Sequence, residues 1–271
     1  MISYSPCKLN IGLEIISKRA DGFHNLETVM YPVPLYDIIE IDSISVNQFE
    51  FTQSGILVNT DTTDNLVYKA WTLLNSEYHF GGIKVHLHKQ IPMGAGLGGG
   101  SANAATMIKM LNQLFNLSIS NEEMEQKAAQ LGSDCPFFIR NTPVFAYNTG
   151  TDFLDLALNL STYHLVIIKP DVSVSTQQAY SGIKPKKANI NLQTLSELSI
   201  DEWQDKVVNQ FENHIFSQLP ELEKIKEKLY NYGAVYSAMS GSGSAIYGLF
   251  KSEPNKLNFD ESYFVWQGKL E

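Results

Sequence analysis

The sequence has 271 residues, of which 44% are hydrophobic and 18% are charged. This composition is typical of a folded globular protein, so it excludes disordered, collagen-like and low-complexity chains. The 29 acidic residues outnumber the 20 basic ones and give a formal net charge of −9, whereas proteins that bind nucleic acids or anionic membranes generally carry the opposite balance. We therefore expect neither nucleic acid nor a membrane as a partner, and a phosphate-binding site must depend on local features.

The beginning of the sequence and its cysteine content predict a cytoplasmic protein. The first ten residues lack the basic segment and apolar run of a signal peptide, and no apolar run reaches the ~18 residues of a membrane span. Two cysteines, Cys7 and Cys135, cannot form a disulfide framework. His86 and His88 share a strand face with Lys84, so we expect them to be solvated and predict no metal site built by the protein alone.

The first third of the chain is predicted to form mainly strands. Residues 37–42, 48–52 and 83–88 alternate apolar and polar side chains, as in a sheet with one solvent-exposed face. Between the last two strands, Asp64 is the expected N-cap of a helix. The apolar positions of this helix are Leu66, Ala70, Leu73 and Leu74.

A glycine cluster and two predicted helices follow Pro92. The first helix is indicated by apolar residues at helical spacing, which are Ala104, Ile108, Leu111 and Phe115. Ser120 and Glu123 have the spacing of a capping box and begin the second helix, which Gly132 is expected to end. Asp134 follows on a predicted loop.

The pattern of strands and helices restarts at about residue 155. Strands are predicted at 163–168, 234–239 and 245–250, and a helix is predicted from Pro220 to Gly233. A further helix is indicated by the spacing of Trp203, Val207, Phe211 and Ile215.

The turn-rich segment 148–152 marks the expected boundary between two domains, which we place at 1–155 and 156–271. Strands and helices are mixed without a strict βαβ rhythm, which favours an α+β fold.

Five of the seven residues from 94 to 100 are glycines, directly before a predicted helix. Glycine lets the backbone approach a ligand closely and adopt positive φ angles. Several N–H groups can then point inward at the positive end of the helix dipole. The segment therefore predicts a phosphate-binding loop, whereas a flexible linker would not lead directly into a strongly periodic helix.

Two common glycine-loop templates fit this segment poorly. The P-loop pattern requires a lysine at the position of Gly100. The dinucleotide pattern fits Gly94, Gly96 and Gly99, but it also requires a buried parallel strand before it and an acidic residue at the end of a second strand. The preceding strand is amphipathic, and Glu122 and Glu123 begin a helix.

Three segments together resemble the motifs of the GHMP kinases, which include galactokinase, homoserine kinase and mevalonate kinase. They are residues 5–13 (SPCKLNIGL), 92–101 (PMGAGLGGGS) and 239–245 (MSGSGSA). The matches occur in the expected order and the resemblance spans nearly the whole chain.

Finer detail resembles the GHMP kinases that act on a cytidine-diphosphate-linked methylerythritol in non-mevalonate isoprenoid synthesis. These matches lie at 18–26, 98–105 and 131–138. Ala102 departs from the pattern where a second serine is common, and Asn209-Gln-Phe-Glu212 replaces an Asn-Asp-Leu-Glu type segment.

The resemblance implies a two-domain fold and a reaction. The N-terminal domain would bind ATP, and a ferredoxin-like C-terminal domain would bind the substrate. ATP would phosphorylate the 2-hydroxyl of the methylerythritol unit, giving the 2-phosphate and ADP, with Mg²⁺ bridging the phosphates. The alternatives are another small-molecule GHMP kinase, of the homoserine or mevalonate type, and a non-catalytic homologue that binds a nucleotide.

The resemblance also implies roles for individual residues. Asp134 is the expected general base, and Lys8 would keep it ionised or stabilise the transferring phosphoryl group. By position alone, Asp134 could equally be a solvated loop residue or a cap of the next element. The expected ATP-binding residues are Asn65, Leu66, Pro92, Met93, Gly94, Ala95, Gly96, Leu97, Gly98, Gly99, Gly100, Ser101 and Ala102.

The expected substrate-binding residues are Asn10, Phe23, His24, Thr176, Tyr180, Gly241 and Ser242. Phe23 and Tyr180 would stack on the cytosine while His24 reads its edge. Gly241 and Gly243 could instead belong to a plain hairpin connection, and Asn65 and Leu66 to the first turn of a helix.

Overall fold

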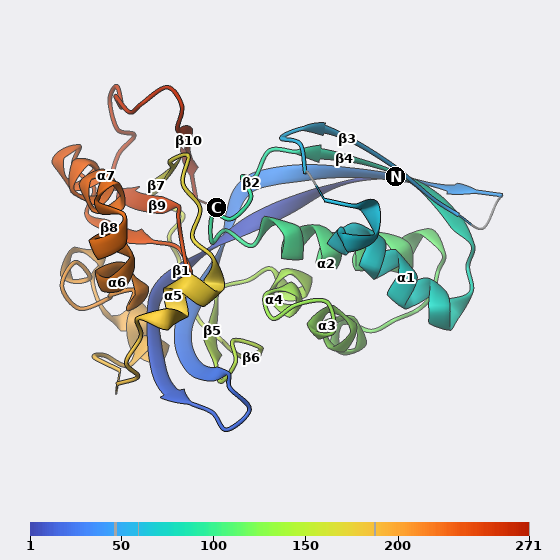
Figure 1. Cartoon of the computed structure of the whole chain (residues 1–271), viewed down its shortest axis with the longest axis horizontal. Coiled ribbons are helices and arrows are strands. Elements are labelled where there is room, and N and C mark those ends of the chain that lie inside the picture. The colour runs from blue at the N-terminus through green and yellow to red at the C-terminus, as the bar shows by residue number, and fades with distance from the viewer. Residues whose placement is uncertain (46–47, 59, 187, 271) are drawn as a thin grey trace. The chain divides into compact units, whose positions relative to one another are not determined.

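Figure 1 shows the computed structural model of the chain, which describes every residue except 46–47, 59, 187 and 271. The chain divides into two compact units, each assembled from separate segments. The first unit is Met1–Cys7, Leu35–Met93 and Gly98–Thr142, and the second is Lys8–Pro34, Gly94–Leu97 and Pro143–Glu271. The strands β1 (Ile2–Lys18) and β2 (His24–Ile44) contribute residues to both units. The division into domains at residue 155 stays a prediction.

The sheet of the first unit is formed around β4 (Gly82–Lys89). β4 pairs antiparallel with β2, from Ile38 opposite His88 to Ile44 opposite Gly82, and parallel with β3 (Phe49–Gly55). The predicted alternation is confirmed, because the apolar side chains of β2 and β4 are buried on one face. They are Ile39, Ile41, Ile83, Val85 and Leu87.

Among the residues of the first unit that the structure describes, four helices lie on one side of these strands (Figure 1). They are α1 (Leu66–Tyr78), α2 (Gly99–Leu114), α3 (Asn121–Ala129) and α4 (Cys135–Arg140). The predicted N-cap of α1 is wrong by one residue. The 3₁₀ turn η1 (Thr62–Asp64) contains Asp64, and the side chain of Asn65 accepts the hydrogen bond from Val67 N at 3.0 Å. The capping box of Ser120 and Glu123 is confirmed. Helix α3 ends at Ala129, earlier than the end predicted at Gly132. Its C-cap is Gln130, which has a right-handed conformation.

The prediction that His86 and His88 are solvated is confirmed only in part, because both rings also have hydroxyl neighbours. Both are half-buried on β4, and Ser54 Oγ lies 2.9 Å from His86 Nε2 and from His88 Nδ1. Thr52 Oγ1 lies 2.9 Å from His86 Nδ1. The parallel pairing of β3 with β4 places these hydroxyls beside the rings. In the described part of the chain, no group of three His, Cys, Asp or Glu side chains is arranged to hold a metal ion.

The second unit contains a four-stranded antiparallel sheet in the order β10-β7-β9-β8. Its strands are β7 (His164–Lys169), β8 (Tyr236–Met239), β9 (Ile246–Phe250) and β10 (Phe264–Lys269). This order is ferredoxin-like. Residues 251–263, all of which the structure describes, contain no helix where that fold has its second one. The unit also contains β5 (Val144–Tyr147), which pairs with residues 28–30 of β2, and β6 (Asp152–Asp155).

In the described part of the second unit, three helices and two 3₁₀ turns complete the fold. They are α5 (Thr176–Ser181), η2 (Leu192–Glu197), η3 (Ile200–Glu202), α6 (Phe211–Gln218) and α7 (Pro220–Asn231). The helix predicted through Trp203 and Val207 is wrong in its first half. Residues 208–210 run beside β1, where Leu13 N donates to Val208 O and Gln210 N to Leu13 O, both at 2.9 Å. Trp203 and Val207 are buried like Phe211. The apolar spacing therefore predicted correctly which residues are buried, although these residues do not belong to one continuous helix.

The core of the second unit lies between its sheet and helices α6 and α7. It includes Val166, Ile168, Ile215, Leu222 and Ile246. Among the described residues, no helix is both long enough and apolar enough to cross a membrane.

Candidate active site

The glycine segment contains alternating residues in the left-handed conformation. Gly94, Gly96 and Gly98 have φ angles of 61°, 73° and 70°. A Cβ atom on Gly96 would collide with the carbonyl oxygen of Ser240. Gly98 is the N-cap of α2, whose first-turn amides have no partner within the helix. The conformation of the segment therefore depends on glycine, and amides without an intrahelical partner suit an anionic ligand.

In the first unit, the beginnings of α2 and α4 are joined through Ser101. Ser101, on the first turn of α2, is hydrogen-bonded to the thiol of Cys135, the first residue of α4. Burial raises the pKa of Cys135 to about 11, although this hydrogen bond opposes the increase. The neighbouring Asp134 carboxylate adds to the increase by charge repulsion. The structure thus brings together the predicted base and a predicted phosphate-binding side chain.

Asp134 occupies the N-cap position of α4, with φ −81° and ψ −15°. This is the position expected if Asp134 were a cap of the next element. Its side chain does not cap the helix, because no capping hydrogen bond joins it to the amides of that first turn, all of which the structure describes. The side chain is half-buried, so its position does not identify it as a structural cap.

Asn65 and Leu66 lie at the beginning of α1, beside the beginning of α2. A Cβ atom on Gly100 would lie 3.7 Å from Leu66 Cδ1. The oxygen of the Asn65 side chain is used in capping α1. The structure therefore confirms the helix-turn role of these residues, which is compatible with the predicted contact to adenine.

In the second unit, Lys8 and Asn10 form a buried pair. The Lys8 ammonium donates a hydrogen bond to Asn10 Oδ1, and each residue is 3% exposed. Asn10 Nδ2 donates to Thr28 Oγ1 at 3.1 Å, and Tyr247 OH donates to the carbonyl oxygen of Asn10 at 3.0 Å. Sequence reasoning missed Thr28 and Tyr247, because nothing near them in the sequence distinguishes them from other strand residues.

The three predicted motifs meet within the second unit. Residues 240–245 form the connection between the antiparallel strands β8 and β9, as the hairpin interpretation predicted. Ser240 Oγ donates to Gly96 O at 2.9 Å and accepts from Asn10 N at 3.2 Å. Lys8 N donates to Leu97 O at 3.0 Å, and Ala245 N to Ala95 O at 3.1 Å. Each motif is therefore hydrogen-bonded to the other two.

The predicted cytidine residues are only partly brought together. The rings of His24 and Tyr180 are stacked, with centroids 4.9 Å apart and planes inclined by 27°. Phe23 is 66% exposed on the turn between β1 and β2. Thr176, the first residue of α5, is exposed, and Ser175 caps that helix. A cytosine held between Phe23 and Tyr180 stays a prediction, and His24 covers one face of Tyr180 in this arrangement.

The remaining predicted residues differ in what they can offer a ligand. Ala95, Leu97 and Ala102 are at most 2% exposed, so they can contribute only backbone groups or packing. Met93 is 43% exposed. Four further predicted site residues are buried or half-buried, and they are Pro92, Gly99, Gly241 and Ser242.

Comparison with known proteins agrees with this fold and these motifs. Residues 65–142 match the GHMP kinases N terminal domain, and residues 189–258 match the GHMP kinases C terminal domain. The class that the fold and the motifs define is therefore the GHMP kinases, and the predicted α+β, two-domain fold is confirmed.

Particular relatives narrow the class. The chain is 45% identical over its full length to a 4-diphosphocytidyl-2-C-methyl-D-erythritol kinase of Parabacteroides distasonis, and 46% identical to one of Bacteroides fragilis, covering all of both relatives. It matches a crystal structure of 4-(cytidine 5'-diphospho)-2C-methyl-D-erythritol kinase with a TM-score of 0.81 and 30% identity, over 92% of this chain and 90% of that one. The chain belongs to the 4-diphosphocytidyl-2-C-methyl-D-erythritol kinase family.

Proposed function

We propose that the protein transfers the γ-phosphoryl group of ATP to the 2-hydroxyl of 4-diphosphocytidyl-2-C-methyl-D-erythritol, giving the 2-phosphate and ADP. The observation that carries this proposal is full-length identity of 45–46% to kinases of that name. The hydrogen bonds that join the three motifs in the second unit support it. We propose residues 1–155 as the ATP-binding domain and 156–271 as the substrate-binding domain.

Asp134 is the general base of the proposed mechanism. A carboxylate that accepts the hydroxyl proton makes the substrate oxygen a better nucleophile for the γ-phosphorus. Its half-buried position beside the buried Cys135 suits this role. Lys8 supplies positive charge toward the transferring phosphoryl group, and Asn10 orients a substrate hydroxyl.

The glycine segment holds the phosphates of ATP through its amides and the Ser101 hydroxyl. Mg²⁺ is usually bound by one or two protein oxygens together with substrate phosphates. Ser101, on the first turn of α2, offers an oxygen of that kind. A bound Mg²⁺ would neutralise phosphate charge at this position. Asn65 and Leu66, at the beginning of α1, are proposed to contact the adenine.

Cytidine recognition falls to the aromatic residues of the second unit. Phe23 is held outward on its turn, where Phe23 N donates to Asp21 Oδ1 at 3.1 Å. His24 and Tyr180 offer a second ring surface and a polar edge, and Thr176, Gly241 and Ser242 offer groups for the diphosphate. A cytoplasmic location is proposed because the reaction consumes ATP and the two cysteines, Cys7 and Cys135, form no disulfide.

The test is ADP release from ATP and Mg²⁺ with the cytidine substrate as acceptor. Asp134→Asn serves as the variant because it keeps the shape of the side chain, and homoserine and mevalonate serve as control acceptors. We expect turnover only with the cytidine substrate and a loss of at least ~100-fold in the variant. Turnover with a control acceptor would identify a different GHMP kinase. Binding of ATP without any turnover would identify a non-catalytic homologue, and full activity of the variant would remove Asp134 as the base.

A further inference from the structure

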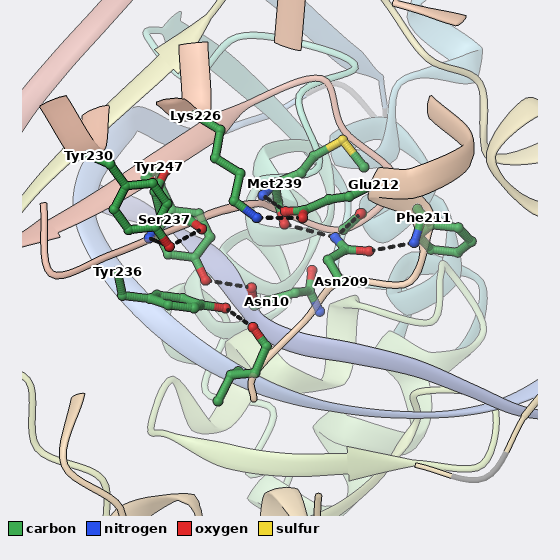
Figure 2. A network of polar contacts seen from close by, with 12 residues as sticks. Asn10, Asn209, Phe211, Glu212, Lys226, Tyr230, Tyr236, Ser237, Met239 and Tyr247 are labelled. Atoms are coloured by element: carbon green, nitrogen blue, oxygen red, sulfur yellow. Dashed lines mark hydrogen bonds and ion pairs between the residues drawn. The ribbon is translucent and has the colours of Figure 1, made fainter. Parts of the chain in front are cut away.

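Asn209 is buried beside the end of β8 and bonds to the backbone there (Figure 2). Its Nδ2 donates to the carbonyl oxygens of Met239 and Gly241, both at 2.8 Å. Its Oδ1 accepts from Phe211 N at 3.0 Å, at the beginning of α6. One side chain therefore fixes the backbone on both sides of Ser240 and ties it to a helix.

Glu212 completes this attachment from the first turn of α6. One carboxylate oxygen accepts from Met239 N at 2.7 Å, and the other accepts from Lys226 Nζ on α7 at 2.6 Å. Glu212 is 7% exposed, and burial raises its pKa although Lys226 opposes the increase. A buried ion pair such as Glu212–Lys226 is expensive to desolvate, and such a pair can often be replaced by well-packed apolar side chains without loss of stability. Stability alone therefore does not explain why a carboxylate is used here.

The backbone held by Asn209 and Glu212 continues into predicted active-site residues. Ser240 Oγ accepts from Asn10 N and donates to Gly96 O, so it joins Asn10 to the glycine segment. A Cβ atom on Gly241 would lie 3.1 Å from Asn10 Oδ1, the atom that accepts from Lys8. A shift of Met239–Gly241 would consequently displace Ser240, Asn10 and the Lys8 ammonium.

We propose that Asn209 and Glu212 are positioning residues for phosphoryl transfer, which act through Met239–Gly241 on Ser240 and Asn10. This inference rests on the proposed function and goes beyond it, because neither residue belongs to the predicted substrate, ATP or catalytic set. A displacement of about 1 Å in a reacting group can reduce the rate about 100-fold, so small backbone shifts at this position are expected to lower kcat.

Three variants separate positioning from general packing. Asn209→Asp replaces a donor with an oxygen that faces two carbonyl oxygens. Glu212→Ala removes the acceptor of Met239 N, whereas Glu212→Gln keeps an oxygen for that bond. The matched control is Tyr230→Phe, which removes two bonds to the opposite end of β8, from Ser237 N at 3.1 Å and to Ser237 O at 3.3 Å, without touching residues 239–241.

Steady-state kinetics per folded molecule, with Tm for each protein, test the proposal. We expect kcat to fall about 10- to 100-fold in Asn209→Asp and Glu212→Ala, to be within about 5-fold of wild type in Glu212→Gln, and within about 2-fold in Tyr230→Phe. The Kd for ATP should change less than about 3-fold in all of them. If Glu212→Ala does not fold, Asn209→Asp carries the test.

Equal kcat losses in the control and in the Asn209 and Glu212 variants would overturn the positioning role, as would unchanged kcat in Asn209→Asp. A folded wild-type protein that does not turn over the cytidine substrate would refute the proposed function, and the positioning role with it. A wild-type protein that turns over normally beside fully active variants would refute the positioning role alone.

Discussion

The Ser101 hydroxyl is hydrogen-bonded to the Cys135 thiol, and this bond joins the first turn of α2 to the first residue of α4. Asp134 directly precedes Cys135, so this bond lies one residue from the proposed base. The thiol is also fully buried. Its protonation is therefore linked to unfolding, which exposes it to water.

Cys135 should make the free energy of unfolding depend on pH in the alkaline range. Its pKa is about 11 in the folded protein against 9.0 in a free thiol, so the unfolded chain binds fewer protons between these values. The stability that the raised pKa contributes is present below pH 9 and is lost as the pH rises toward 11, at up to about 1.4 kcal/mol per pH unit. Urea unfolding of wild type and Cys135→Ala at pH 7.5, 8.5, 9.5 and 10.5 checks this.

The difference in unfolding free energy between these two proteins should stay constant from pH 7.5 to 8.5 and shrink above pH 9. Other alkaline groups titrate in both proteins and cancel in the difference. A difference that does not change with pH would show that the native thiol ionises as readily as the unfolded one.

Gly96→Ala should destabilise the protein and abolish turnover, whereas Gly94→Ala should be milder. Both residues have positive φ angles, which cost a side-chain-bearing residue about 1–2 kcal/mol. Only at Gly96 would the new Cβ also collide with backbone, at Ser240 O, because a Cβ on Gly94 would meet nothing closer than Ser173 Oγ at 3.6 Å. Urea unfolding and ADP release measured on both variants check the contrast, and equal losses in the two would contradict it.

Local signals in the sequence predicted most elements correctly, because the forces that define them act over a few residues. Ser120 and Glu123 form the expected capping box, and Pro220 begins the expected helix. The prediction of the α1 N-cap failed because Asp64 and Asn65 are adjacent and both residue types cap helices well. Asp64 belongs to the 3₁₀ turn Thr62–Asp64, so Asn65 is the cap.

The candidate site was predictable only as motifs, since the contacts that organise it join distant residues. Tyr247 bonds to Asn10 across 237 positions, and Asn209 bonds to Met239 across 30. Asn209 and Glu212 carried a signal, because a buried Asn and Glu beside an apolar helix face require partners. The sequence could not say which backbone groups those partners are.

Tyr180→Leu should raise the KM for the cytidine substrate while leaving the KM for ATP unchanged. The Tyr180 ring stacks on His24 and packs edge-on against Phe211, with centroids 4.9 Å apart in each pair. Removing a ring that contacts the base costs roughly 1–3 kcal/mol, which corresponds to an increase of about 5- to 150-fold. Tyr180→Phe keeps the ring and should behave like wild type. An unchanged KM in Tyr180→Leu would exclude the ring from base recognition.

Lys8 and Asn10 should behave as one unit in a double-mutant cycle, because the Lys8 ammonium donates directly to Asn10 Oδ1 and both side chains are almost fully buried. Lys8→Met should lower kcat by at least ~100-fold through lost charge stabilisation of the transferring phosphoryl group. Asn10→Ala should lower kcat as well, since it removes the acceptor that orients the ammonium. Groups that act together lose their joint contribution once either is removed, so the double variant should be little slower than Lys8→Met. This is tested by measuring kcat for wild type, Lys8→Met, Asn10→Ala and the double variant, with ATP binding as the control for folding. Losses that multiply in the double variant would mean that Lys8 contributes its charge independently of Asn10.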